Sequence, residues 1–258
     1  MLSDAEIKNE KTSRKEINPV IHLEKLNKSF GDNHVLRDFS FDLFPEENVV
    51  VLGKSGSGKS VLIKCIIGLV KPDSGSIDVL GKDIPSLTHE ELDKIRAKVG
   101  FLFQSNALYD SMTVRENLEF PLRRHWIQKD KETEDKLVME ALTNVGLAET
   151  VDMMPSELSG GMKKRIALAR TLILKPEIIL YDEPTTGLDP ITAKEIIKLM
   201  IAVQKKYNAS SLIISHDMNC VKTASHRIVM LIDGRCYAVG TYDELIKSND
   251  KKVKQFFE

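Results

Sequence analysis

Apolar and polar residues alternate along two segments near the start of the chain, 20–30 and 35–44. Such alternation is typical of antiparallel strands that bury one face, and the residues between the two segments have turn chemistry. The segments 227–233 and 235–240 flank an Asp-Gly pair, which predicts a hairpin late in the chain. The sequence therefore predicts antiparallel strands in two places.

Three other segments are apolar without alternation, namely 49–52, 178–181 and 211–215. A short continuous apolar run is typical of a strand that is buried on both faces of a parallel sheet. The long stretch 88–175 instead favours helices. We therefore expect an α/β fold in which a helical insertion interrupts a mixed sheet.

Three Thr-x-x-Glu patterns, beginning at Thr88, Thr113 and Thr241, match the capping box that starts many helices. The first two fall in the helical stretch, and the third predicts a helix near the end of the chain.

We expect one domain after a polar tail. The predicted parts are a mobile tail over 1–18 and a domain over 19–258, which comprises a core with an antiparallel lobe (19–87 and 176–240), a helical lobe (about 88–175) and a C-terminal helix (241–258).

Charge and composition exclude several classes of protein. The 258 residues include 37 basic and 38 acidic ones, so the chain lacks the basic excess that nucleic-acid-binding proteins usually carry. Its three cysteines lack the spacing of a zinc site and fit a reducing compartment. The most apolar run, 61–70, contains Lys64 and is too short to span a membrane. We expect no signal peptide, no membrane span and no nucleic-acid partner.

A glycine-rich motif follows the first buried run. Its residues fit the pattern GxxxxGK[ST] and are Gly53, Lys54, Ser55, Gly56, Ser57, Gly58, Lys59 and Ser60. In this motif backbone N–H groups wrap the phosphates of a nucleotide, the lysine reaches the β- and γ-phosphates, and the serine binds Mg²⁺. A chance glycine-rich turn is the alternative. The predicted strand before the motif and helix after it favour the phosphate site.

Two carboxylates, Asp182 and Glu183, come directly after the apolar run 178–181. A carboxylate at the end of an apolar strand is costly unless it serves an ion or a reaction. We expect Asp182 to hold Mg²⁺ through water and Glu183 to orient and polarise an attacking water. Alone, the pattern also fits a solvated acidic turn. With the glycine-rich motif, it predicts a site for ATP and Mg²⁺.

The stretch LSGGMKKRIALAR (158–170) resembles the signature of ABC ATPases, and it precedes the acidic strand as in that family. Other family motifs follow in order: Phe30 resembles the aromatic residue that stacks on adenine, Gln104 the Q-loop glutamine, Asp189 the D-loop aspartate, and His216 the H-loop histidine. The chain is thus identified as a member of the ABC ATPases. This implies a P-loop NTPase core with a mixed sheet, an antiparallel β subdomain and a helical subdomain.

The resemblance also implies roles that the residues alone do not fix. Ser159, Gly160 and Gly161 would bind the γ-phosphate held by a second subunit, which implies two sites shared in a head-to-tail homodimer. Asp189 would lie at the same interface, where each nucleotide is held between the two subunits. Gln104 would join the Mg²⁺ site, and the implied catalytic residues are Lys59, Gln104, Glu183 and His216. We interpret the Lys163-Lys164-Arg165 run as a solvated helix face.

A narrower resemblance concerns 102–123 and 154–165. These segments look like the ATP-binding subunits of MCE/Mla-type phospholipid transporters, with Met162 where many ABC proteins have glutamine. This implies a membrane permease, an MCE-domain lipid-binding protein, and a location on the cytoplasmic face of the inner membrane. The apolar residues after the Q-loop would either receive a permease helix or form the core of the helical lobe; they are Ala107, Leu108, Tyr109 and Met112.

Other functions use the same nucleotide chemistry. A chromosome or repair ATPase usually carries a long coiled coil or a zinc module between the P-loop and the signature, but 61–158 contains no sustained heptad run and no cysteine pair. A small P-loop kinase would leave the signature and His216 without a purpose. An ABC transporter for another substrate stays open, because the permease and its binding protein select the substrate.

Overall fold

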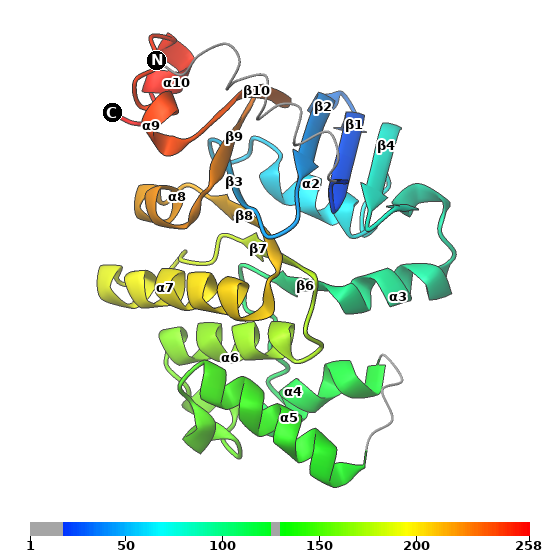
Figure 1. Cartoon of the computed structure of the whole chain (residues 1–258), viewed down its shortest axis with the longest axis vertical. Helices are drawn as coiled ribbons and strands as arrows, with labels where there is room; N and C mark the ends of the chain where they lie inside the picture. The colour runs from blue at the N-terminus through cyan, green and yellow to red at the C-terminus, as the bar shows by residue number, and fades with distance from the viewer. Residues whose placement is uncertain (1–17, 125–129) are drawn as a thin grey trace.

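The computed structural model describes residues 18–124 and 130–258, so the predicted tail lies almost wholly outside the described residues. The described strands form two sheets, a four-stranded antiparallel one with the order β2-β1-β4-β5 and a six-stranded one with the order β10-β9-β3-β8-β7-β6. Figure 1 shows the two sheets side by side. The strands are β1 (Ile21–Phe30), β2 (Asn33–Leu43), β3 (Asn48–Leu52), β4 (Ser74–Val79), β5 (Lys82–Asp83), β6 (Val99–Leu102), β7 (Ile178–Asp182), β8 (Ser210–Ser215), β9 (Arg227–Ile232) and β10 (Arg235–Gly240).

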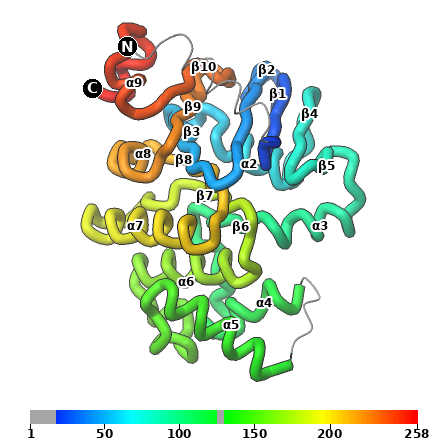
Figure 2. Tube along the Cα trace, viewed as in Figure 1, coloured from blue at the N-terminus to red at the C-terminus, as the bar shows by residue number. Residues whose placement is uncertain are grey.

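The helices surround the six-stranded sheet, and α4, α5 and α6 gather at the end of the molecule away from α9 (Figure 2). Within the described ranges, no helix is long and apolar enough to cross a bilayer. The helices are α2 (Lys59–Ile66), α3 (His89–Lys98), α4 (Val114–Arg124), α5 (Lys131–Asn144), α6 (Gly160–Leu172), α7 (Pro190–Tyr207), α8 (Met218–Ala224), α9 (Tyr242–Leu245) and α10 (Lys251–Lys254).

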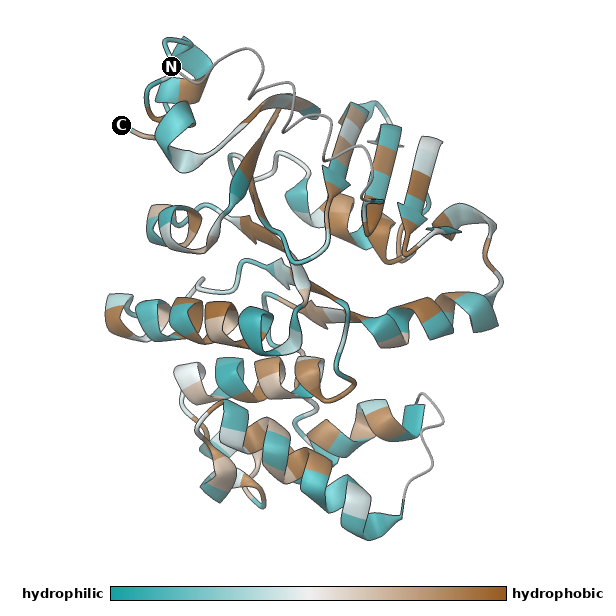
Figure 3. Cartoon of the chain, in the orientation of Figure 1, coloured by the Kyte–Doolittle hydropathy of each residue, from teal (hydrophilic) through white to brown (hydrophobic). Residues whose placement is uncertain are grey.

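The central strands β3, β7 and β8 of the six-stranded sheet are buried on both faces, which explains their unbroken apolar runs. Along β3, Val49 and Val51 belong to one hydrophobic cluster, whereas Val50 and Leu52 belong to another. The first cluster continues into β1, β2 and α2, and the second into α6, α7 and α8. Figure 3 shows hydrophobic residues along these strands and a mainly hydrophilic α3 at the periphery. Because full burial of each such side chain contributes about 1.5–3 kcal/mol, the two clusters stabilise the sheet.

The α/β fold with a mixed sheet is confirmed. Strands β1 and β2 pair antiparallel, as do β9 and β10, whereas β3, β6, β7 and β8 pair in parallel. The three predicted capping boxes also form: the backbone N–H groups of Glu91, Glu116 and Glu244 donate to the threonine hydroxyls, and the glutamate carboxylates accept from the threonine N–H groups. Local sequence therefore determines these helix starts.

Two expectations need correction. The stretch 88–175 is not helical throughout, because Val99–Leu102 forms β6 at the edge of the parallel sheet and pairs with β7. The end of the chain, 241–258, contains two short helices, α9 and α10, in place of one. The first correction matters for the site, since β6 leads directly into Gln104.

The parallel register brings four strand ends to one edge of the sheet. Leu52 at the end of β3 pairs with Ser215 at the end of β8, and Asp182 at the end of β7 pairs with Ile214. In β6, Leu102 pairs with Tyr181 of β7. Ligands of open parallel sheets bind outside the carboxyl ends of the strands. The residues that follow these four strands are therefore the candidates for a functional site.

Candidate active site

Lys59, the first residue of α2, lies almost buried behind the glycine-rich loop, with 6% of its surface exposed. Its Nζ donates to the carbonyl oxygens of Gly53 at 2.8 Å and Lys54 at 3.0 Å. Burial lowers the pKa of Lys59, while the carboxylates of Glu183 and Asp182 act in the opposite direction. The ammonium is thus held at the loop by carbonyl oxygens and by two nearby acids.

The loop can form only with glycine at position 58. Gly58 has φ 102°, a left-handed conformation that other residues rarely adopt. A Cβ atom there would approach Val35 Cγ1 to 2.7 Å. Gly58 precedes Lys59, so this turn directs the first N–H groups of α2 toward the loop. A helix N-terminus of this kind favours an anion such as phosphate.

Two oxygen-bearing side chains, Ser60 and Asp182, lie side by side next to Lys59. Ser60 Oγ donates to Asp182 Oδ1 at 3.1 Å, which joins the start of α2 to the end of β7. Burial is the main cause that raises the pKa of Asp182. A hydroxyl and a carboxylate are oxygen donors of the kind that Mg²⁺ takes, and Mg²⁺ typically adds water and substrate phosphate to one or two such groups. The residues present therefore fit Mg²⁺.

Glu183 has an unusual backbone. Its φ is 50°, although it is not glycine, and its N–H donates to the Ile214 carbonyl at 3.0 Å. Residues in this left-handed region cost free energy and concentrate at functional sites. Its carboxylate is 3.9 Å from Lys59 Nζ through Oε1, while Oε2 accepts a hydrogen bond from Thr186 Oγ1 at 3.3 Å. The strained turn thus aims the carboxylate at the loop.

His216 follows β8 and lies beside Glu183, with 2.8 Å between His216 Nδ1 and Glu183 Oε2. Its side chain is 65% exposed, so it is not a core histidine. His226 contrasts with it: this ring accepts a hydrogen bond from the Asn48 N–H at 3.1 Å and has a structural position. His216 is therefore free to meet a ligand.

A cavity of about 480 Å³ joins most of these residues. Phe30 stands at its wall with 51% of its surface exposed, and Lys28 Nζ lies 5.3 Å from the ring centroid. An exposed aromatic ring beside a phosphate-binding loop has the geometry to stack on a base. The lining residues are Phe30, Val35, Ser55, Gly56, Gly58, Lys59, Ser60, Val61, Gln104, Glu183 and His216.

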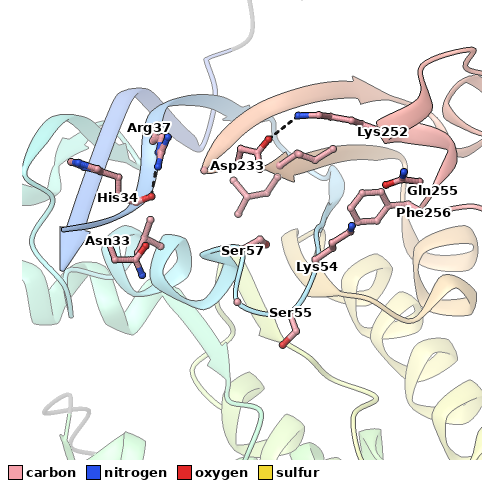
Figure 4. Close-up of a pocket in the computed structure, with 15 residues that line it drawn as sticks. Asn33, His34, Arg37, Lys54, Ser55, Ser57, Asp233, Lys252, Gln255 and Phe256 are labelled. Carbon is pink, nitrogen blue, oxygen red and sulfur yellow. Dashed lines mark hydrogen bonds and ion pairs between the residues drawn. The ribbon is translucent and has the colours of Figure 1, made fainter. Parts of the chain in front are cut away.

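Two residues of the glycine-rich motif face elsewhere. Lys54 and Ser57 line a neighbouring hollow of about 640 Å³, which also includes the ion pair between Asp233 and Lys252 (Figure 4). Ser57 Oγ is buried and has no hydrogen-bond partner among the described residues. Because neither residue lines the cavity that contains Lys59, the contribution of Lys54 and Ser57 to nucleotide binding stays a prediction.

The signature residues do not line the cavity that contains Lys59. Ser159 caps α6, accepting a hydrogen bond from the Met162 N–H at 3.2 Å, and both Ser159 and Gly160 are exposed. A Cβ atom on Gly160 would meet nothing within 4 Å, whereas one on Gly161 would approach Thr192 Cγ2 to 2.6 Å. Gly161 thus lets α6 and α7 pack closely, and Gly160 presents bare backbone to solvent.

Asp189 is the N-cap of α7. Its Oδ1 accepts from the N–H groups of Ile191 and Thr192, each at 3.0 Å. Hydrogen bonds from Thr192 lower the pKa of Asp189. The side chain therefore orders the start of α7, and the predicted contact with a nucleotide stays a prediction.

The interpretation of the Lys163-Lys164-Arg165 run as a solvated face is wrong for Lys164. This side chain is only 2% exposed, and its Nζ donates to the Gln104 carbonyl at 2.9 Å. Burial lowers the pKa of Lys164 to about 8. The sequence does indicate this burial, because Lys164 shares a helix face with the apolar residues Ala167 and Leu168 at i+3 and i+4.

The fold and this arrangement define an ATP-binding cassette. The model of the ABC transporter family matches residues 36–186, which is more than half of the chain. The chain therefore belongs to the ABC transporter family.

Similar proteins include ATP-binding subunits of several transporters. The "Probable ribonucleotide transport ATP-binding protein mkl" of Mycobacterium leprae is 41% identical over 236 residues, which span 92% of this chain and 68% of that protein. The "Intermembrane phospholipid transport system ATP-binding protein MlaF" of Haemophilus influenzae is 35% identical over 239 residues, 93% of this chain and 90% of that protein. A solved dimeric cassette in a post-hydrolysis state, bound to ADP and Pi, has 31% identity and a TM-score of 0.79, with coverage of 86% and 98%.

Proposed function

We propose that this protein binds and hydrolyses ATP as a head-to-tail homodimer and powers phospholipid transport through a separate membrane permease, as in MCE/Mla-type systems. The observation that carries the proposal is the Glu183 carboxylate, which lies between Lys59 and His216 at the wall of the cavity. A buried acid beside a phosphate-binding lysine suits attack by water on the terminal phosphate. The assembly would sit on the cytoplasmic face of the inner membrane.

Each residue has a role that follows from its position. Phe30 stacks on the adenine, and the backbone N–H groups of the loop bind the phosphates. Lys59 neutralises charge on the terminal phosphates, Glu183 accepts a proton from the attacking water, and His216 holds the γ-phosphate in line. The residues that would hold Mg²⁺ are Ser60, Asp182 and Gln104. When bound, Mg²⁺ supplies charge neutralisation at the β- and γ-phosphates.

The position of the signature supports a shared site. Ser159 and Gly160 expose a helix start that does not line the cavity of the same chain. An exposed anion-binding end and an incomplete phosphate cavity complement each other if two copies pack head to tail. The similar cassette bound to ADP and Pi is a dimer, which agrees with this arrangement.

Mixing two inactive variants tests the shared site. Lys59→Ala removes the phosphate lysine, and Ser159→Arg blocks the signature; each homodimer is expected to lose ATP hydrolysis. In a mixed dimer, the intact Lys59 of one subunit meets the intact Ser159 of the other, so phosphate release should return in part. Hydrolysis by Ser159→Arg alone, or a mixture that stays inactive while both variants fold and bind each other, contradicts the shared site. Phosphate transfer to a small acceptor would favour the kinase alternative.

A groove beside the Q-loop supports permease docking. It has a volume of about 450 Å³ and is lined by an aromatic group, Phe101, Phe103, Tyr109 and Phe120, together with Arg170 and Ala107. Tyr109 is 43% exposed, whereas Leu108 packs against the hydrophobic core. Each interpretation of this segment therefore fits different residues. Tyr109 and Ala107 face the groove and could contact a permease helix, whereas Leu108 belongs to the core of the helical lobe.

The phospholipid assignment rests on the resemblance at Met162 and the Q-loop and on the similarity to MlaF. It is tested by purifying the tagged full-length protein from detergent-solubilised membranes and identifying its proteins and lipids by mass spectrometry. Recovery of a permease and an MCE-domain protein with bound phospholipid is the expected result. A permease with a different binding protein and no phospholipid would favour the alternative of another substrate and leave the ATPase assignment intact. Glu132→Gln, a change on an exposed face of α5, serves as a control for expression.

A further inference from the structure

The signature helix α6 holds the main chain of the Q-loop from the side. Lys164 Nζ donates to the Gln104 carbonyl at 2.9 Å. Two turns further along, Arg170 donates to the carbonyls of Asn106 at 2.9 Å and Ala107 at 2.7 Å. Three carbonyl oxygens of an irregular segment are therefore bound by cations from one helix.

The Q-loop needs such support because its own backbone is strained. Asn106 has φ 64° and Ala107 has φ 52°, in the left-handed region that residues other than glycine rarely adopt. On the other side of the loop, the buried Asn117 of α4 accepts from the Tyr109 N–H at 2.8 Å and donates to the Tyr109 and Met112 carbonyls. A strained segment persists only where its surroundings determine it. Here the surroundings are side chains of α6 and α4.

The burial of the Lys164 side chain costs folding stability. Its side chain is 2% exposed, and within residues 18–124 and 130–258 its ammonium forms no ion pair within 4 Å and has the Gln104 carbonyl as its one hydrogen-bond acceptor. The Asp182 carboxylate favours the charge from a greater distance, but burial outweighs it and lowers the pKa of Lys164. Burying an ammonium without a paired charge costs stability, and an apolar side chain of similar size would usually serve the fold better. The cost points to a task other than holding the fold together.

The position of Gln104 indicates this task. Its carbonyl faces Lys164, while the residue lines the cavity that contains Lys59 and Glu183. We propose that Lys164 is a positioning residue, which fixes the main chain at Gln104 so that the glutamine reaches the phosphate cavity. The inference rests on the proposed ATP hydrolysis and names a residue that acts through Gln104. Because Ser159 caps the same helix, the Lys164 hydrogen bond joins the main chain of Gln104 to the signature helix.

Hydrogen exchange of the full-length protein tests the positioning without any nucleotide. The N–H groups of Asn106 and Tyr109 are hydrogen-bonded, to the Phe103 carbonyl at 3.1 Å and to Asn117 Oδ1 at 2.8 Å, so their exchange reports opening of the loop. Lys164→Met is expected to speed exchange in 103–109 at least tenfold. Lys163→Met, a change at the adjacent and partly exposed lysine, is the matched control and should leave exchange unchanged. Equal exchange in the two variants would overturn the proposal.

Kinetics separate positioning from a purely structural role. Lys164→Met should lower kcat for ATP as far as Gln104→Ala does, with KM within about twofold, and the double variant should be no slower than Gln104→Ala alone. Its melting temperature should stay equal or rise, because an unpaired buried charge is removed. Additive losses in the double variant, or a lower melting temperature with unchanged kcat, would overturn the proposal. If the wild type releases no phosphate, the proposed function fails, while the exchange experiment still decides the role of Lys164.

Discussion

The Nδ1 atom of His216 lies 2.8 Å from the Oε2 atom of Glu183, although the two residues belong to the ends of different strands. The parallel register of β7 and β8 produces this contact, because Asp182, one residue before Glu183, pairs with Ile214, two residues before His216. The histidine and the carboxylate therefore face each other at the carboxyl end of the sheet. Their mutual position is set by the sheet and not by a flexible loop.

Replacing Glu183 by glutamine removes the proton acceptor and keeps the shape. We expect Glu183→Gln to retain ATP binding and to lower phosphate release by about a hundredfold or more, the usual range for loss of general acid–base catalysis. A dimer that persists in ATP should appear by size-exclusion chromatography with light scattering. Glu132→Gln, on an exposed face of α5, is the control. Hydrolysis at the wild-type rate in Glu183→Gln would exclude the proposed role.

Removing the His216 ring leaves the Glu183 carboxylate without its neighbour. We expect His216→Ala to lower kcat about a hundredfold while the KM for ATP changes little, because in the proposed mechanism the ring contacts the terminal phosphate and not the adenine. His89→Ala, a change at the exposed start of α3, should keep wild-type kinetics. A large rise in KM without loss of kcat would instead make His216 a binding residue.

The hydrogen bond between Ser60 and Asp182 predicts a change in metal dependence. Ser60→Ala removes one of the proposed oxygen ligands, so half-maximal hydrolysis should require roughly tenfold more Mg²⁺. Titration of Mg²⁺ at fixed ATP measures this shift. Ser86→Ala, a change at an exposed serine before α3, is the control. An unchanged Mg²⁺ requirement would remove Ser60 from the metal site.

The exposed ring of Phe30 predicts a change in nucleotide affinity alone. Stacking of an aromatic side chain on a base contributes about 1–3 kcal/mol, so Phe30→Ala should raise the KM for ATP roughly tenfold at nearly constant kcat. Phe30→Trp keeps a ring and should restore the affinity. Tyr237→Ala removes an exposed ring outside the cavity and should have no effect. Equal KM values for Phe30→Ala and the wild type would rule out stacking.

The two signature glycines predict different consequences for folding: substitution at Gly161 should destabilise the fold, and substitution at Gly160 should not. Gly161→Ala drives a methyl group into Thr192 Cγ2 and should destabilise the fold by about 1–3 kcal/mol, the usual cost of overpacking. Thr192→Ser removes that methyl and should restore stability in the double variant. Gly160→Ala meets open space and should melt like the wild type, yet reduce ATP-dependent dimerisation. Urea denaturation measures the first pair, and light scattering the last.

Sequence predicted the elements whose signals are local. The apolar runs at 49–52, 178–181 and 211–215 became three central strands, because two-sided burial demands such runs. The threonines of the three capping boxes, Thr88 among them, likewise carry their partners within four residues. The glycine-rich motif and the acidic strand end are local too, and the structure places Lys59, Asp182 and Glu183 close together.

Sequence failed where partners are distant. Strand β6 has only four residues and contains a glycine, so its pattern does not stand out from the helices around it, and its pairing with β7 decides its conformation. Lys164 looked solvated beside Lys163 and Arg165, but its acceptor is a carbonyl sixty positions earlier. The side of the loop on which Lys54 and Ser57 lie depends on the β9–β10 turn and α10, which lie far along the chain.

The two hydrophobic clusters on either side of the sheet also fix the position of Asp182 relative to Ser60. Leu180 belongs to one cluster and Tyr181 to the other. Sliding β7 by one residue would exchange these two side chains between the clusters and shift Asp182 by about 3.3 Å, beyond reach of Ser60 Oγ. The shifted register is therefore disfavoured by the misplaced hydrophobic side chains, whether or not a nucleotide is bound. The position of Asp182 relative to Ser60 is therefore set by the burial of Leu180 and Tyr181 on opposite faces of the sheet.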